Sequence, residues 1–97
     1  MLDADEYIVV HVSPACGHCV TLVTRLAREW AQWPPAVRCR VLLDSIQGNP
    51  TSAEFLQSVP TVRVFKGASV TPAQEFQGPP DPMAVIQGLL FGAWRPA

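Results

Sequence analysis

Several features that would assign this chain to a broad functional class are missing from its 97 residues. Seven basic and eight acidic side chains leave a formal net charge of −1, so nothing suggests a basic surface for nucleic acid or an anionic membrane. No apolar run approaches the roughly 20 residues that a membrane-spanning helix needs. Three cysteines are too few, and odd in number, for a disulfide-stapled secreted domain. We therefore expect a globular protein without nucleic-acid or membrane partners.

Length and composition set the scale of the fold. Residues 1–97 provide one domain with a single hydrophobic core, and an apolar fraction of 48% is ordinary for a folded protein. The first six residues are mostly acidic or apolar and precede only a short apolar run, which is untypical of a secretory signal peptide. Together with the low cysteine count, this predicts a cytoplasmic location.

The first half of the chain alternates strand and helix patterns. Residues 7–12 form an apolar run typical of a buried strand. From residue 16 to about 33, apolar positions recur at three- and four-residue spacing, which predicts an amphipathic helix ending before Pro34. Residues 37–43 predict a second strand with Cys39 as a buried core thiol. Strand, helix and strand in this order predict a parallel βαβ unit.

The second half predicts one short helix, a hairpin and a final helix. An Asn-Pro pair begins a helix over residues 49–57. Residues 60–66 form a third strand, and a fourth follows near 70–76, where Pro72 predicts an edge position. The last helix covers residues 83–91 after a capping Asp-Pro pair. The order β-α-β-α-β-β-α predicts an α/β fold with a four-stranded mixed sheet flanked by three helices.

Between the first strand and the first helix lies the motif Cys16-Gly17-His18-Cys19. The N–H groups and macrodipole at a helix N-terminus favour negative charge on the first sulfur. Two cysteines three positions apart at a helix start can also close a small disulfide ring. This combination indicates a reversible thiol–disulfide couple, and a pair of buried structural thiols is the alternative.

The order of elements and three short motifs resemble the thioredoxin superfamily over nearly the whole chain. The motifs are the Cys-x-x-Cys sequence, a Val-Pro-Thr that opens an apolar strand ending in Phe-Lys-Gly, and a glycine before the last helix. The resemblance implies a thioredoxin-like fold and a thiol–disulfide oxidoreductase that uses no cofactor beyond its own Cys16–Cys19 dithiol. It implies no metal. Disulfide-containing proteins are the expected substrates, a recycling reductase or glutathione the expected electron donor, and a monomer the expected state.

The resemblance also implies roles for the four residues of the motif. Cys16 is the expected nucleophile, and Cys19 the expected resolving thiol that attacks the mixed disulfide. Gly17 and His18 tune the nucleophile. His18, protonated or hydrogen-bonding, would favour the thiolate and raise the reduction potential above about −270 mV, the value for thioredoxin.

A second set of site residues comes from the third strand. The resemblance implies a cis bond between Val59 and Pro60, and places Val59, Pro60 and Thr61 across from the cysteines. An extended substrate would pair with the Val59 backbone there as a short antiparallel strand.

The chain also departs from thioredoxins. Only six residues precede the first strand, as in a smaller, glutaredoxin-sized core. Ala15 replaces the tryptophan that usually precedes the first cysteine, and Val10 replaces a buried acid on the first strand. The Gly-His pair between the cysteines is that of protein disulfide isomerase domains.

Two other functions remain open at this stage. A glutathione-dependent glutaredoxin is one, although Pro79 and Pro80 would remove two backbone donors from the region that binds glutathione in those proteins. A small zinc-binding module is the other, with the two motif cysteines joined by ligands among His11, His18 and Cys39. The chain has no second close pair of ligands, which structural zinc sites commonly use.

Overall fold

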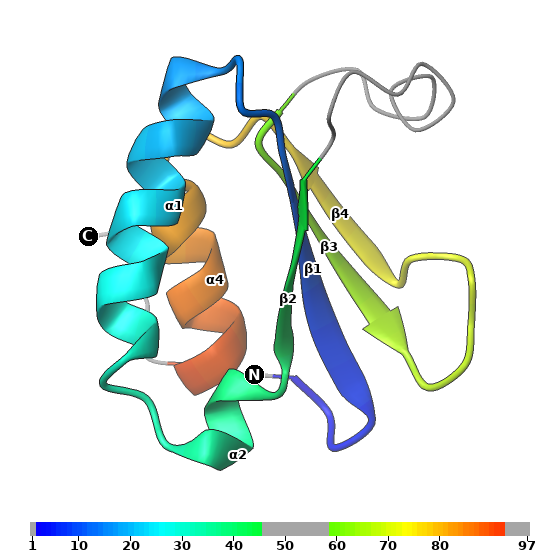
Figure 1. Ribbon diagram of the computed structural model, residues 1–97. Helices are drawn as coiled ribbons and strands as arrows, with labels where there is room; N and C mark the ends of the chain where they lie inside the picture. Colours follow the sequence, from blue (N-terminus) through cyan, green and yellow to red (C-terminus); the bar gives the residue numbers. More distant parts are fainter. Residues whose placement is uncertain (1, 46–58, 93–97) are drawn as a thin grey trace.

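A single mixed sheet forms the centre of the structure, a computed structural model that describes residues 2–45 and 59–92 (Figure 1). The strand order is β2-β1-β3-β4. Helices α1 and α4 lie side by side on one face of this sheet (Figure 1). The strands are β1 (Glu6–Val12), β2 (Val41–Ser45), β3 (Thr61–Lys66) and β4 (Gln74–Gln77). The helices are α1 (Gly17–Trp30), α2 (Pro35–Arg38) and α4 (Pro82–Phe91).

The pairing of the strands follows the predicted topology. β1 runs parallel to β2 and antiparallel to β3, and β3 and β4 form an antiparallel pair. A parallel half joined to an antiparallel hairpin is the predicted mixed four-stranded sheet, so the α/β fold class is confirmed. The predicted helix at 49–57 lies outside the described residues.

Alternation along β1 sets the position of the core. Ile8, Val10 and Val12 are buried and point toward the helices, because successive side chains of a strand face opposite sides. Leu22 and Leu26 of α1 cover them and are themselves buried. Each such side chain contributes about 1.5–3 kcal/mol when it is removed from water. This layer holds the start of α1 against the end of β1.

The second strand begins later than the sequence pattern predicted. Residues 35–38 form α2, a helical turn that starts at a proline, where a missing N–H and a fixed φ are favourable. Cys39 ends this turn and is exposed. The predicted strand over residues 37–43 is therefore wrong for residues 37–40 and confirmed for 41–43, which belong to β2. The prediction of a buried Cys39 thiol is wrong. The apolar residues of this segment alternate as they do in a strand, but residues 35–38 form a helical turn.

Two further boundaries differ from the sequence pattern, and one cap agrees. α1 ends at Trp30, three residues before the predicted end, and a turn leads to Pro34. Pro72 lies before β4 and not within it, although β4 does occupy the predicted edge. At the start of α4 the Asp81 carboxylate accepts the N–H of Ala84 at 3.1 Å, as a capping residue should.

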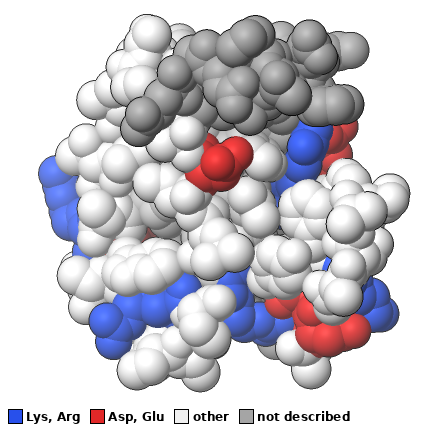
Figure 2. Space-filling view, turned by 45° about the vertical axis from the view of Figure 1, so that its right-hand side comes forward, with Lys and Arg blue, Asp and Glu red and all other residues white. Residues whose placement is uncertain are grey.

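Figure 2 shows one face of the molecule, on which Lys and Arg side chains lie at the left border and in an interrupted row across the lower part. One acidic group lies near the centre of this face, among uncharged residues. Across residues 2–45 and 59–92, every helix is too short or too polar to cross a membrane.

The core assignment predicts a clear contrast between two substitutions. Ile86 of α4 is fully buried, whereas Val70 is 92% exposed. Ile86→Ala should lower the free energy of unfolding by about 2–5 kcal/mol because it leaves a cavity, and Val70→Ala should change it by less than about 0.5 kcal/mol. Urea denaturation followed by circular dichroism measures both. Similar losses in the two variants would contradict the core described above.

Candidate functional site

Cys16 is the residue that caps the N-terminus of α1. Its backbone is extended, with φ −100° and ψ 118°, and its Sγ accepts the N–H of Cys19 at 3.3 Å. The sulfur thus takes the place that a serine or aspartate oxygen holds in most helix caps. The first N–H groups of a helix have no partner within the helix and point toward this position, and together with the helix macrodipole they favour a negative charge on the sulfur.

The two cysteines of the motif have opposite acid–base behaviour. Hydrogen bonds from the thiol and the N–H of Cys19 lower the pKa of Cys16, with a smaller contribution from the N–H of His18. Cys19 is only 1% exposed. Its burial raises the pKa of its thiol to about 11, and the hydrogen bond to Cys16 adds to this effect. The partly exposed sulfur therefore ionises first, and the buried one keeps its proton.

The chain returns to this sulfur 43 residues later. The carbonyl oxygen of Val59 lies 3.8 Å from the Sγ of Cys16, as the acceptor of a weak thiol hydrogen bond. The peptide bond between Val59 and Pro60 is cis. Thr61, the first residue of β3, is fully buried, opposite His11 of β1. Val59 and Pro60 thus lie at the motif, while Thr61 lies behind it in the sheet.

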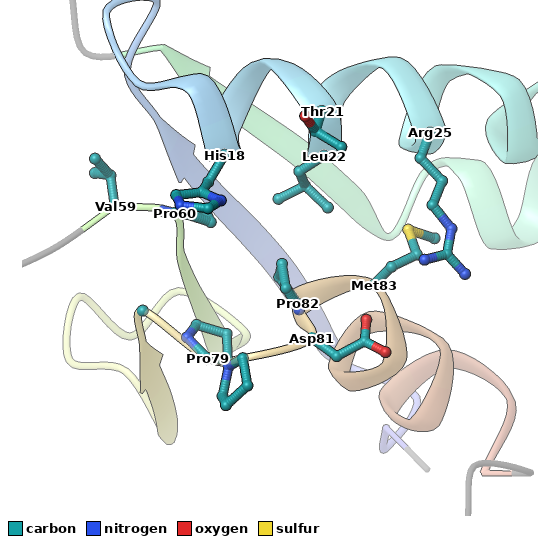
Figure 3. A pocket seen from close by; sticks show the side chains of 12 residues that line it. His18, Thr21, Leu22, Arg25, Val59, Pro60, Pro79, Asp81, Pro82 and Met83 are labelled. Carbon is teal, nitrogen blue, oxygen red and sulfur yellow. The ribbon is translucent and has the colours of Figure 1, made fainter.

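A groove of about 430 Å³ begins beside the motif and runs between α1 and the loop before α4 (Figure 3). The N–H of Gly78, a residue with a positive φ of 54°, bonds to the carbonyl of Pro60 at 3.0 Å and fixes this loop. The groove is lined by His18, Thr21, Leu22, Arg25, Val59, Pro60, Gly78, Pro79, Pro80, Asp81, Pro82 and Met83.

The sequence analysis missed the α1 residues that continue this groove beyond His18. Thr21, Leu22 and Arg25 follow His18 at steps of three and four, which place them on one helix face. That spacing was readable from the sequence. The opposite wall comes from the loop before α4, and its position beside α1 depends on the tertiary fold.

Charges of both signs lie toward the far end of the groove. Arg25 of α1 is 54% exposed and forms an ion pair with Glu29 at 3.4 Å. Asp81 lines the facing wall, where its carboxylate caps α4 (Figure 3). Between the sulfur and these charges the lining includes Leu22, Met83 and several prolines. The groove therefore offers apolar surface near the motif and charged groups further away.

The remaining candidate ligands lie elsewhere. His11 bonds through Nδ1 to Asp44 of β2 at 2.8 Å, and Cys39 lies at α2, at the opposite end of the sheet from the start of α1 (Figure 1). In the two described stretches, 2–45 and 59–92, no cluster of three His, Cys, Asp or Glu side chains could hold a metal ion.

Comparison with known proteins agrees with this geometry. No protein-family model matches the sequence, and no curated protein matches it. Among solved structures, mitochondrial thioredoxin 3 from Saccharomyces cerevisiae is similar with a TM-score of 0.57 and 18% identity, over 88% of this chain and 76% of that one. The chain has the thioredoxin fold. Thioredoxin f from spinach chloroplast gives a TM-score of 0.58 and 17% identity over 89% and 71% of the two chains. A designed protein gives 0.55 and 24% over 87% and 74%.

Within this thioredoxin fold, the cause of the low Cys16 pKa can be tested by a matched pair of variants in a Cys39→Ser background. Cys19→Ser keeps a side-chain donor for the Cys16 sulfur, and Cys19→Ala removes it. Because only the thiolate reacts, the rate of alkylation by iodoacetamide rises as pH passes the pKa. We expect the midpoint in the serine variant to lie below about 8.5, the value of a free cysteine, and the midpoint in the alanine variant to lie higher. Equal midpoints would contradict the assigned cause.

Proposed function

We propose that this protein is a thiol–disulfide oxidoreductase that exchanges its Cys16–Cys19 dithiol with disulfides of other proteins. The observation that carries the proposal is the contrast between the two sulfurs at the start of α1. Cys16 is partly exposed and has a lowered pKa, while Cys19 is buried and has a pKa raised to about 11. An attacking thiolate beside a protonated reserve thiol is what a two-step exchange requires.

The proposed reaction transfers two electrons to the substrate. The Cys16 thiolate attacks one sulfur of the substrate disulfide, that S–S bond breaks, and the other substrate sulfur leaves as a thiolate that takes up a proton. Cys19 then loses its proton and attacks the Cys16 sulfur, which forms the intramolecular disulfide and releases the second substrate thiolate. The redox group is the dithiol itself, so the reaction needs no further cofactor. A reductase or glutathione then restores the dithiol.

The surroundings of Cys16 suggest how a protein substrate binds. An extended segment can pair with the Val59 backbone as a short antiparallel strand, which brings its disulfide beside the Cys16 sulfur. Its neighbouring side chains then occupy the groove along α1. Pro79 and Pro80 in the groove wall have no N–H to donate, which favours protein substrates over the glutathione reaction of a glutaredoxin. A single chain supplies every residue of this site. We propose that it acts as a reductant in the cytoplasm.

Trapping experiments test the proposed order of attack. With insulin as the disulfide substrate, Cys19→Ser should accumulate a mixed disulfide through Cys16, which mass spectrometry and non-reducing electrophoresis detect. Cys16→Ser should form no adduct. In its presence dithiothreitol should reduce insulin no faster than dithiothreitol does alone. Cys39→Ser is the control and should retain the rate of the unmodified protein. Full activity in Cys16→Ser would refute the proposal.

We propose further that His18 raises the reduction potential through its backbone N–H. The two hydrogen bonds from Cys19 lower the pKa of Cys16 most, and among the groups of His18 the backbone N–H is the one that adds to this effect. His18→Ala keeps this N–H and should leave the potential nearly unchanged. His18→Pro removes it, destabilises the thiolate form, and should move the potential by tens of millivolts toward about −270 mV, the value for thioredoxin. Titration in glutathione redox buffers measures both. An equal shift in the two variants would assign the effect to the imidazole ring instead.

A further inference from the structure

A second pocket lies beside the buried cysteine of the motif. Cys19 is in the wall of a pocket of about 250 Å³, which shares no lining residue with the groove beside Cys16. The walls of this pocket come from the end of β1, the loop before α1, α1 itself and β2, and they include the hydroxyl-bearing residues Ser13, Thr24 and Ser45. A pocket of this size with polar groups in its wall can hold water. Water can therefore lie beside Cys19 even when a substrate fills the groove.

The loop before α1 holds Ser13 in a fixed position at this pocket. The carbonyl of Ser13 accepts the N–H of Cys16 at 3.1 Å, which closes a turn through Pro14 and Ala15. Serine followed by proline is a favoured start for such a turn. The hydroxyl oxygen of Ser13 also accepts the N–H of Ala15 at 3.3 Å. These two bonds fix the peptide group of Ser13 relative to the motif.

The N–H of Ser13 lies past the end of the sheet ladder and points to the second sulfur. The last pair between β1 and β3 joins His11 to Thr61, two residues before Ser13. Burial and the hydrogen bond to Cys16 raise the pKa of Cys19, and a hydrogen bond from the backbone of Ser13 lowers it. A bond of this kind favours the thiolate. Ser13 thus contacts both cysteines, Cys16 through its carbonyl and Cys19 through its N–H.

We propose that the backbone N–H of Ser13 stabilises the Cys19 thiolate as it attacks the mixed disulfide at Cys16. This inference rests on the exchange reaction proposed above. Water in the second pocket takes the proton of Cys19. The Cys19 thiolate then attacks the Cys16 sulfur, the bond between the two cysteines forms, and the bond from Cys16 to the substrate breaks. The substrate sulfur leaves as a thiolate and takes up a proton.

The burial of Cys19 makes a single donor important. Cys19 is only 1% exposed, so little water can stabilise charge on its sulfur directly. In such surroundings a hydrogen bond is electrostatically stronger than it is in water. The turn through Pro14 holds the Ser13 donor in place before the thiolate forms, so the peptide group need not reorient during the reaction.

An ester at residue 13 tests the N–H alone. A synthetic peptide of residues 1–15 can be ligated to a fragment that begins with Cys16, because this ligation requires an N-terminal cysteine. In the peptide, the α-hydroxy acid that corresponds to serine replaces Ser13, so an ester oxygen takes the place of the N–H. The fragment carries Cys39→Ser, which leaves only the two thiols of the motif. A matched control chain carries the same backbone change at Ala4, an exposed residue.

Reaction with dithiobis(nitrobenzoate) separates the two steps. Attack by Cys16 releases one coloured thiolate and attack by Cys19 releases the second, and stopped-flow absorbance follows both. The ester at residue 13 should slow the second release about tenfold, the lower end of the effect of a hydrogen bond to a charged group. The first release should keep its rate. The Ala4 ester should match the all-amide chain in both steps.

The outcomes distinguish this inference from the exchange reaction on which it rests. Equal second releases from the two ester chains would overturn the role of Ser13 and leave the exchange reaction standing. An all-amide chain that gives no second release would overturn both. Hydrogen exchange followed by NMR needs no ester: the Ser13 amide proton should exchange faster in Cys19→Ala than in Cys19→Ser, which keeps a side-chain acceptor. Equal exchange in these two variants would also overturn the inference.

Discussion

The hydrogen bond from the Cys19 amide to the Cys16 sulfur is the interaction on which the site depends. It caps α1 and stabilises negative charge on the sulfur in one contact, so helix formation and thiol activation share a cause. This hydrogen bond can form only because α1 begins at Gly17, directly after Cys16. The buried layer of Ile8, Val10 and Leu22 fixes this start against the sheet, and the packing of the core thereby contributes to the chemistry at the surface.

The same packing explains the contrast between the sulfurs. Cys19 lies one turn into α1, on the face that packs on the sheet, so the desolvation that stabilises the helix raises the pKa of its thiol. Val10 is fully buried at the position where thioredoxins carry an acid. No carboxylate at this position can accept the proton of Cys19, so in the proposed reaction the attack by Cys19 depends on another base or on water. We expect this step to be slower than attack by Cys16.

The parts of the fold that local chemistry determines were predictable from the sequence. Periodicity identified β1 and α1, and the Asp-Pro pair identified the start of α4. Cys39 shows where such reasoning fails: its alternating apolar neighbours satisfied a strand pattern, but Pro34 and Pro35 start a helical turn that leaves the thiol exposed. The contact between Cys16 and Val59 had no local signal and was expected only from the family resemblance. Arg25 and Asp81 come from distant segments, so their position on facing walls of one groove follows from the tertiary fold.

The position of β2 in the sheet separates two surfaces with different requirements. In the proposed reaction the groove beside Cys16 must stay open to bind successive substrates, and it is built from α1, the Val59 and Pro60 residues before β3 and the loop before α4. The β2 edge lies on the other side of β1 from β3, so its half-exposed leucines lie away from the groove. Because β1 lies between the two surfaces and is buried on its helix face, the packing that positions the cysteines does not depend on the outer edge of the sheet.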